Sequence, residues 1–150
     1  MAFRFTLEAV LRYRRSLEDR EQMRLQPLLA RRAALQQERQ RAREARLRLQ
    51  TALHQGLERA PVPAIEIQFS GVCLRGLEGG EALLQSQLQQ LQSEITQQTA
   101  RYQQERRKRE VLESLRDGQL RDYRLRQQRR EQALRDEMYL LGRTRNAARA

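Results

Sequence analysis

The residues of this chain that could do chemistry are few and scattered. One histidine, His54, and one cysteine, Cys73, occur in 150 residues, too few for a tetrahedral zinc site, a disulfide or a Cys-His nucleophile pair. Gly79 and Gly80 are followed by Glu81 and not by the Lys and Ser or Thr of a phosphate-binding loop. The carboxylates have no cleft in which to pair if the chain is an extended rod. The sequence therefore predicts a protein that is not an enzyme, with no catalytic residue, metal, cofactor or small-molecule substrate.

Arginine is the dominant functional group. The chain has 29 Arg, one Lys and 21 Gln, and its net charge of +11 would attract nucleic acid, acidic lipid headgroups or an acidic protein face. The densest basic run, Arg106–Arg109, is the best candidate for a nucleic-acid patch. Acidic residues interrupt the basic runs, however, and the four tyrosines are far apart. This pattern favours a solvated helix face, and we expect no nucleic-acid partner.

The elements that must carry these arginines are two long helices. Composition changes near residues 59 and 81: residues 1–58 have 13 basic and 7 acidic side chains, residues 59–80 have two of each, and residues 81–150 have 15 and 10. We interpret these segments as a first coiled-coil helix, a connecting loop, and a second coiled-coil helix with a short basic tail. Because the arms have similar lengths, the predicted fold is all-α, an antiparallel two-helix coiled-coil hairpin.

A weak heptad stripe supports the coiled coil in the first arm. Counted from Leu7, the a positions include Leu28, Leu35 and Leu49, and the d positions, such as Val10, are apolar about half the time. Leu11, Leu25 and Leu53 lie beside this seam. Pro27 falls inside the stripe, and it predicts a kink or a restart of the helix there. The second arm begins with a tighter stripe: Leu84, Leu88, Leu91 and Ile95.

The segment between the arms is uncharged overall and apolar. Ile65, Ile67 and Phe69 alternate with Glu66 and Gln68, a pattern that also fits a short strand. Since a single strand would have no partner here, we expect an apolar loop. Its side chains either cap the turn of the hairpin or bind another protein.

The chain opens with Phe-Arg-Phe-Thr-Leu-Glu-Ala-Val-Leu-Arg-Tyr-Arg at residues 3–14, and Glu-Asp-Arg-Glu-Gln follows at residues 18–22. This opening resembles the start of the flagellar export protein FliJ family, which reads Phe-x-Phe-x-Leu-x-x-Val-Leu followed by a basic residue. A Gln-rich second arm and late Arg-Glu-Gln and Asp-Glu steps extend the resemblance over nearly the whole chain, although only the first dozen residues are specific.

The resemblance implies a stalk and adaptor of the bacterial flagellar type III export apparatus, and so a role in cell motility and chemotaxis. Such a protein enters the ring of the export ATPase, contacts the cytoplasmic part of the membrane export-gate protein and escorts export chaperones. It would be cytoplasmic and peripherally associated with the cytoplasmic face of the inner membrane at the flagellar base. For docking at the ATPase, the resemblance implies basic residues from both ends of the chain, which an antiparallel hairpin would bring together: Arg4, Arg12, Arg14, Arg130, Arg135 and Arg143.

Family members contact the gate through apolar and aromatic side chains near the hairpin turn. The present sequence has no Tyr or Phe between Gln22 and Ile67, so other side chains would replace them: Phe69, Leu74, Leu77, Leu84 and Leu88. Three alternatives stay open: a basic coiled coil that binds nucleic acid, the equivalent stalk of a virulence injectisome, and a self-associating structural coiled coil.

Overall fold

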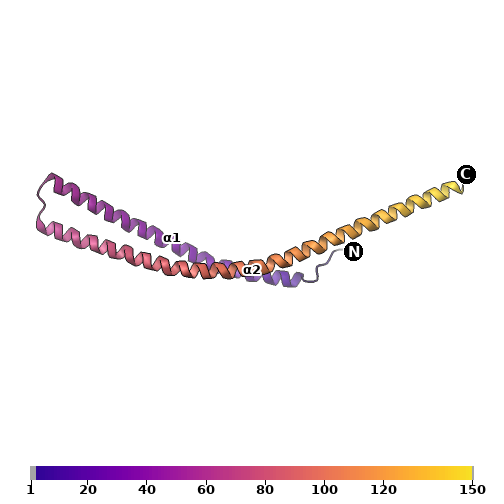
Figure 1. Ribbon diagram of the computed structural model, residues 1–150, viewed down its shortest axis with the longest axis horizontal. Helices are drawn as coiled ribbons and strands as arrows, with labels where there is room; N and C mark the ends of the chain where they lie inside the picture. The colour runs from indigo at the N-terminus through magenta and orange to yellow at the C-terminus, as the bar shows by residue number, and fades with distance from the viewer. Residues whose placement is uncertain (1–2, 150) are drawn as a thin grey trace. The chain divides into compact units, whose positions relative to one another are not determined.

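A computed structural model describes residues 3–149 of the chain. Its two helices are α1, Glu8–Arg59, and α2, Ala64–Ala147, and residues 60–63 connect them (Figure 1). The two long helices pack against each other, and the described residues include no strand. The predicted all-α helical hairpin is confirmed.

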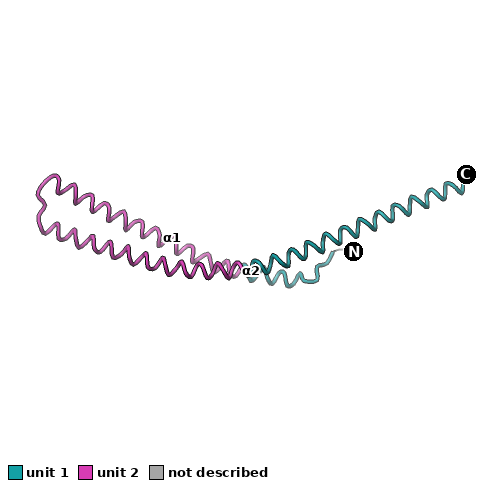
Figure 2. Tube along the Cα trace, in the orientation of Figure 1, with its two compact units in different colours: residues 1–18, 104–150 teal, residues 19–103 magenta. Residues whose placement is uncertain are grey.

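The chain divides into two compact units, coloured separately in Figure 2. Unit 2, residues 19–103, contains the turn and is the closed end of the hairpin. Unit 1 combines residues 1–18 with residues 104–150, so the start of α1 lies beside the middle of α2. Within unit 1, the rings of Phe3 and Tyr123 are in contact, with centroids 5.7 Å apart.

The heptad prediction for α1 is right for one column and wrong for the other. All the predicted a positions face the partner helix at least in part, but most of the predicted d positions, including Val10, Arg24 and Arg31, are exposed. The second column lies one residue later, and its leucines are those that the sequence placed beside the seam: Leu11, Leu25 and Leu53. In a heptad the second apolar column can lie either three or four residues after the a positions. The leucines at the a positions are the same in both cases, so they do not show which of the two columns is used.

The partner column on α2 is regular over its whole paired length. Within unit 2 its members are Leu74, Leu77, Glu81, Leu84, Leu88, Leu91, Ile95, Gln98 and Tyr102, and within unit 1 they are Glu105, Arg109, Leu112, Arg116, Gln119 and Tyr123. The unit 2 part is mostly apolar and the unit 1 part mostly polar. Few side chains are fully enclosed, because each helix packs against a single neighbour; the buried apolar ones are Phe5, Leu11, Leu91 and Ile95.

The turn is shorter than the sequence predicted. Residues 59–80 were expected to form a connecting loop, but α2 begins at Ala64 and its amides at Glu66 and Ile67 bond to the carbonyl of Pro63. Pro63 therefore starts the helix, a position where the missing N–H of proline is harmless. The short-strand alternative is also wrong, because the alternating isoleucines lie on the first two turns of α2.

Val62 fills the end of the hairpin. Its side chain is half-buried in a small hollow with Leu49, Leu53 and Gly56 of α1, so this valine helps to close the turn. At the other predicted irregularity, α1 continues through Pro27 without a break, so the helix does not restart there. A kink at Pro27 stays a prediction. The second helix extends to Ala147, beyond the expected start of a basic tail.

We expect the Leu11→Ala variant to lower the free energy of unfolding by about 2–4 kcal/mol, because Leu11 is fully buried and truncation leaves a cavity. Urea unfolding followed by circular dichroism measures the change. The matched control is Leu134→Ala on the exposed part of α2, which should change the free energy of unfolding by less than about 0.5 kcal/mol. Equal shifts in the two variants would contradict this packing.

Candidate functional site

The described residues contain no cluster of His, Cys, Asp and Glu that could hold a metal ion. His54 is exposed and lies 3.3 Å from its helical neighbour Glu58, and Cys73 is a half-buried free thiol. Neither residue has a second chemical group positioned for catalysis. Within residues 3–149, no helix is long and apolar enough to cross a membrane.

Unit 1 is held together by a cluster of ionic groups in its seam. The guanidinium of Arg109 donates to the carboxylates of Glu18 on α1 and Glu113 on α2, and Arg15 Nη2 donates to Glu113 Oε1 at 2.9 Å. Arg14 and Glu105 extend the cluster, with 3.6 Å between Nη1 and Oε2. These pairs occupy seam positions where a coiled coil usually has apolar side chains, so they fix the alignment of the helices.

The cluster shifts the ionisation of its members. The hydrogen bond from Arg15 is the largest cause that lowers the pKa of Glu113; burial opposes it and the charge of Arg109 reinforces it. The hydrogen bond to Glu18 is the largest cause that raises the pKa of Arg109. Both shifts favour the charged forms, which indicates that the ion pairs outweigh the loss of hydration.

In unit 2 the polar seam contacts are fewer. The side-chain amide of Gln98 donates to the backbone carbonyl of Glu21 at 3.0 Å and to its carboxylate at 2.6 Å. Nearer the turn, Arg46 Nε donates to Glu81 Oε1 at 2.8 Å. These contacts bracket the leucine-rich part of the hairpin and confirm its antiparallel register.

Four of the five residues predicted for the export-gate contact lie in the seam of unit 2: Leu74, Leu77, Leu84 and Leu88. Each is half-buried because α1 covers it. Their accessible surface is therefore small, and Phe69 is the one member of the set that is exposed, at 69% of its surface.

The structure places Phe69 in an exposed apolar face at the start of α2. Ile65, Phe69 and Val72 follow each other at spacings of four and three, so they share one side of the helix and line a shallow groove. They are 71%, 69% and 58% exposed. Of the two possibilities that the sequence left open for these side chains, capping of the turn is therefore wrong. The helical spacing was present in the sequence, but the alternation of Ile65, Ile67 and Phe69 favoured a loop.

Glycine continues the same line. Gly76 and Gly79 follow Val72 at helical spacing, and exposed Leu83 comes one turn later. A methyl group added at either glycine would meet no atom within 4 Å. Since glycine inside a helix is less favourable than alanine by about 1 kcal/mol, nothing within this chain favours it at these positions.

The predicted ATPase-docking arginines do not form a single tip. At the amino-terminal end Arg4 and Arg12 are exposed and line a hollow with Arg116, and Arg14 faces Glu105. The partners of this end are thus residues 105–123 of α2, and Arg130, Arg135 and Arg143 lie farther along the helix. At 1.5 Å per residue, Arg143 is about 30 Å beyond Tyr123.

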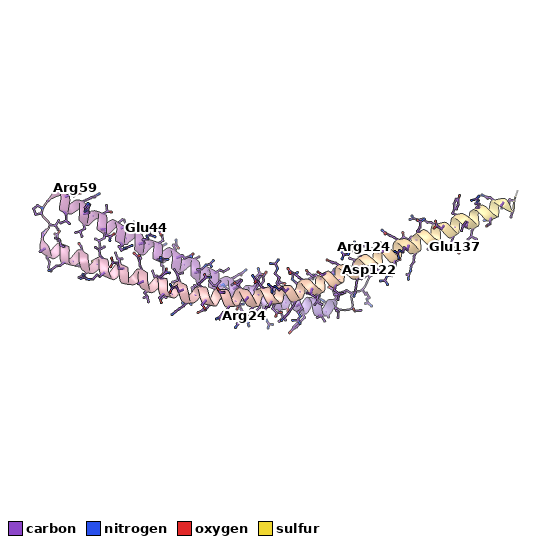
Figure 3. The ribbon with its side chains drawn as sticks, viewed as in Figure 1. Arg24, Glu44, Arg59, Asp122, Arg124 and Glu137 are labelled. Carbon is purple, nitrogen blue, oxygen red and sulfur yellow. The ribbon has the colours of Figure 1, made fainter. Side chains whose placement is uncertain are left out.

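The last part of α2 has no partner helix. All residues described from Gln128 onwards are exposed, and in Figure 3 the side chains around Glu137 extend from a single helix. Arg135 pairs weakly with Glu131 of the same helix, at 3.8 Å. Leu134, Met138 and Leu141 form an exposed apolar line at helical spacing among these arginines.

The sequence matches the family model described as Flagellar FliJ protein over residues 3–147. The chain belongs to the FliJ family. Searches of curated proteins and of solved structures gave no match. This FliJ-family chain is a flagellar export-associated protein, and its family is a non-catalytic component of the export apparatus that interacts with other components of it. The flagellar branch predicted from the opening residues is confirmed, and the family match gives no support to the injectisome alternative.

The predicted nucleic-acid patch of the FliJ-family chain is largely neutralised. Lys108 pairs with Glu105 at 2.8 Å, Arg106 pairs with Glu110 at 2.8 Å, and Arg109 is engaged in the ionic cluster. A nucleic acid would have to compete with these carboxylates. The run Arg106–Arg109 thus supports packing and helix formation better than it supports nucleic-acid recognition.

We expect the ionic cluster to make stability depend on acidic pH. Because the pKa of Glu113 is lowered from its ordinary value of 4.5 in the folded state, its contribution is present above that value and is lost as the pH falls through the folded pKa. Arg109 stays charged throughout this window. The melting temperature of the Glu113→Gln variant should therefore be lower at pH 7 and should fall less between about pH 5 and pH 3 than that of the wild type.

The control is Glu131→Gln, which removes an exposed carboxylate farther along α2 that pairs with Arg135 and not with the ionic cluster. Its melting curve should follow the wild-type pH profile. If both variants reduce the fall in melting temperature at acidic pH equally, the ionic cluster is not the cause of the pH dependence.

Proposed function

We propose that this FliJ-family chain links the flagellar export ATPase ring to the cytoplasmic part of the membrane export-gate protein, through two surfaces that lie in different units of the chain. The exposed apolar face at the start of α2 would contact the gate. The unpartnered arginine-rich end of α2 would contact the ATPase ring. Escort of export chaperones is part of the proposal on the family resemblance alone.

The observation that carries the gate contact is the exposure of Ile65, Phe69 and Val72 beside glycines that nothing in the chain requires. Apolar side chains aligned on one exposed side of a helix are typical of a protein-binding surface. Gly76 and Gly79 would let a partner segment approach the backbone of α2 closely. We therefore revise the contact set from the seam leucines to Ile65, Phe69, Val72 and Leu83.

The argument for the ATPase contact is charge and exposure. Between Gln128 and Ala147 the helix has five arginines and three acidic residues, and none of these side chains is covered by another helix. A cationic helix end gains energy from entering an acidic pore. The amino-terminal Arg4 and Arg12 would contribute from the side of the paired region in unit 1, and not from the free end.

We expect Phe69→Ser to weaken binding to the purified cytoplasmic part of the gate protein by roughly 10-fold or more, because an apolar anchor at an interface is worth about 1–2 kcal/mol. The melting temperature should hardly change, since the ring is exposed. Calorimetric titration measures the affinity. Leu134→Ser is the matched control, a similarly exposed apolar residue on the far part of α2, and should bind the gate normally.

The Gly79→Ala variant separates stability from gate binding, because the two should change in opposite directions. It should raise the stability of the helix by up to about 1 kcal/mol and still weaken gate binding, if a partner lies against the glycine. Unchanged affinity in both Phe69→Ser and Gly79→Ala would exclude this face as the gate contact.

We expect the purified chain to show no nucleotide hydrolysis and to stimulate the cognate ATPase ring. Replacing Arg130, Arg135 and Arg143 by Gln should reduce this stimulation and make it less sensitive to salt, because the attraction is electrostatic. The steady-state rate of phosphate release measures the effect. The control replaces Arg39, Arg41 and Arg43, which removes the same charge from α1; an equal loss would assign the effect to net charge.

A further inference from the structure

The structure reveals an arginine surface that the sequence analysis did not single out. Residues 31–48 of α1, within unit 2, contain seven arginines and two acidic residues over about 27 Å of helix. Arg32 donates to Gln92 at 3.5 Å and Arg46 donates to Glu81, and these contacts bracket the segment. Between Glu81 and Gln92, α2 has no other charged residue.

Most of these arginines are therefore unneutralised. Arg39, Arg41, Arg43 and Arg48 are exposed, and among the described residues none of them lies within ion-pair distance of a carboxylate. The two acidic residues of the segment are Glu38 and Glu44, and the carboxylate of Glu44 accepts a hydrogen bond from the side chain of Gln40. This surface differs from the run Arg106–Arg109, where nearby carboxylates take up the charge.

The arginines stand on both sides of a line of mostly uncharged residues, and Glu44, which accepts a hydrogen bond from Gln40, is the acidic member beside it. Leu29, Gln40 and Leu47 share one exposed side of α1 at helical spacing, and Ala33 and Gln36 complete it. Arg39 and Arg43 flank this line on one side, and Arg41 and Arg48 flank it on the other.

We propose that this face of α1, here called the arginine face (Arg39, Arg41, Arg43 and Arg48 with Leu29 and Leu47), binds an anionic phospholipid surface. Guanidinium groups bind phosphate oxygens in a bidentate manner, and a helix that lies in the headgroup region directs its basic side chains to both sides. Between Tyr13 and Phe69 the chain has no aromatic side chain that could stack on bases. The charge and composition of the face thus favour lipid over nucleic acid.

The proposal goes beyond the link between ATPase and gate and does not rest on it. It gives the chain a direct attachment to the membrane, in addition to any attachment through the gate protein. Basic side chains near an anionic bilayer each contribute about 1 kcal/mol, which corresponds to roughly a fivefold factor in partitioning. Four arginines together suffice for reversible association, without a membrane-spanning helix.

Flotation with lipid vesicles tests the proposal on the full chain at an ionic strength of about 0.15 M. The wild type should float with vesicles containing about one third phosphatidylglycerol and should not float with pure phosphatidylcholine. The variant with Arg39, Arg41, Arg43 and Arg48 all replaced by Gln should bind roughly 600-fold more weakly if the four factors multiply. The same four positions replaced by Lys should keep the part of the binding that depends on charge alone and lose only what the bidentate contacts add.

The matched control replaces Arg121, Arg124, Arg126 and Arg129 of α2 by Gln, which lowers the net charge by the same amount. It should lose less than about tenfold. Equal losses in the two Gln variants, or a wild type that does not float, would overturn the proposal. So would tighter binding of a random-sequence DNA duplex at the same salt, if the arginine-face variant abolished it. Phe69→Ser should float normally, so this test and the gate test can fail independently.

Discussion

The pairing of the helices in unit 1 depends on one guanidinium group, that of Arg109. It occupies a seam position and reaches Glu18 on one helix and Glu113 on the other. Removing Arg109 would leave Glu18, a buried carboxylate, without the partner described for it, a larger penalty than the loss of a surface ion pair. Apolar burial cannot replace this contact, because Phe5 and Leu11 are the buried apolar side chains described in the unit. Alignment here is set by charge.

The fold was predictable because it rests on periodicity and composition. Leucines seven residues apart and the scarcity of glycine and proline in the arms predict two helices, and similar arm lengths predict the hairpin. The exact seam was harder to predict, because polar residues that an apolar pattern does not identify occupy part of it: Arg14, Glu18 and Arg32. The start of α2 was misjudged for a related reason. In a segment with apolar residues at spacings of both two and four, periodicity alone does not decide between loop and helix.

The interaction surfaces were the hardest part to predict, because a residue belongs to such a surface only where the rest of the chain leaves it exposed. Nothing in the sequence distinguishes Phe69, which is exposed, from Leu74, which α1 half covers. Likewise, Arg106 and Arg43 lie in equally basic runs, but one has a carboxylate within reach and the other does not. The register of the two helices determines the exposure of Phe69 and Leu74, whereas the partner of Arg106 is Glu110, one turn away on the same helix. Family membership predicted that such surfaces exist, and the pairing of the helices determines which residues form them.

The four-residue connection at residues 60–63 has a consequence for how the hairpin forms and opens. Contacts close to the turn join residues 35 positions apart, and the contacts of Arg15 with Glu113 join residues 98 positions apart. Closing the longer loop directly would cost only about 1 kcal/mol more entropy, but pairing that propagates from the turn closes each step over a few residues. The chain can therefore zip from its closed end. By the same logic it unzips from the open end, so the amino terminus can separate from α2 while the leucine seam beside the turn stays paired.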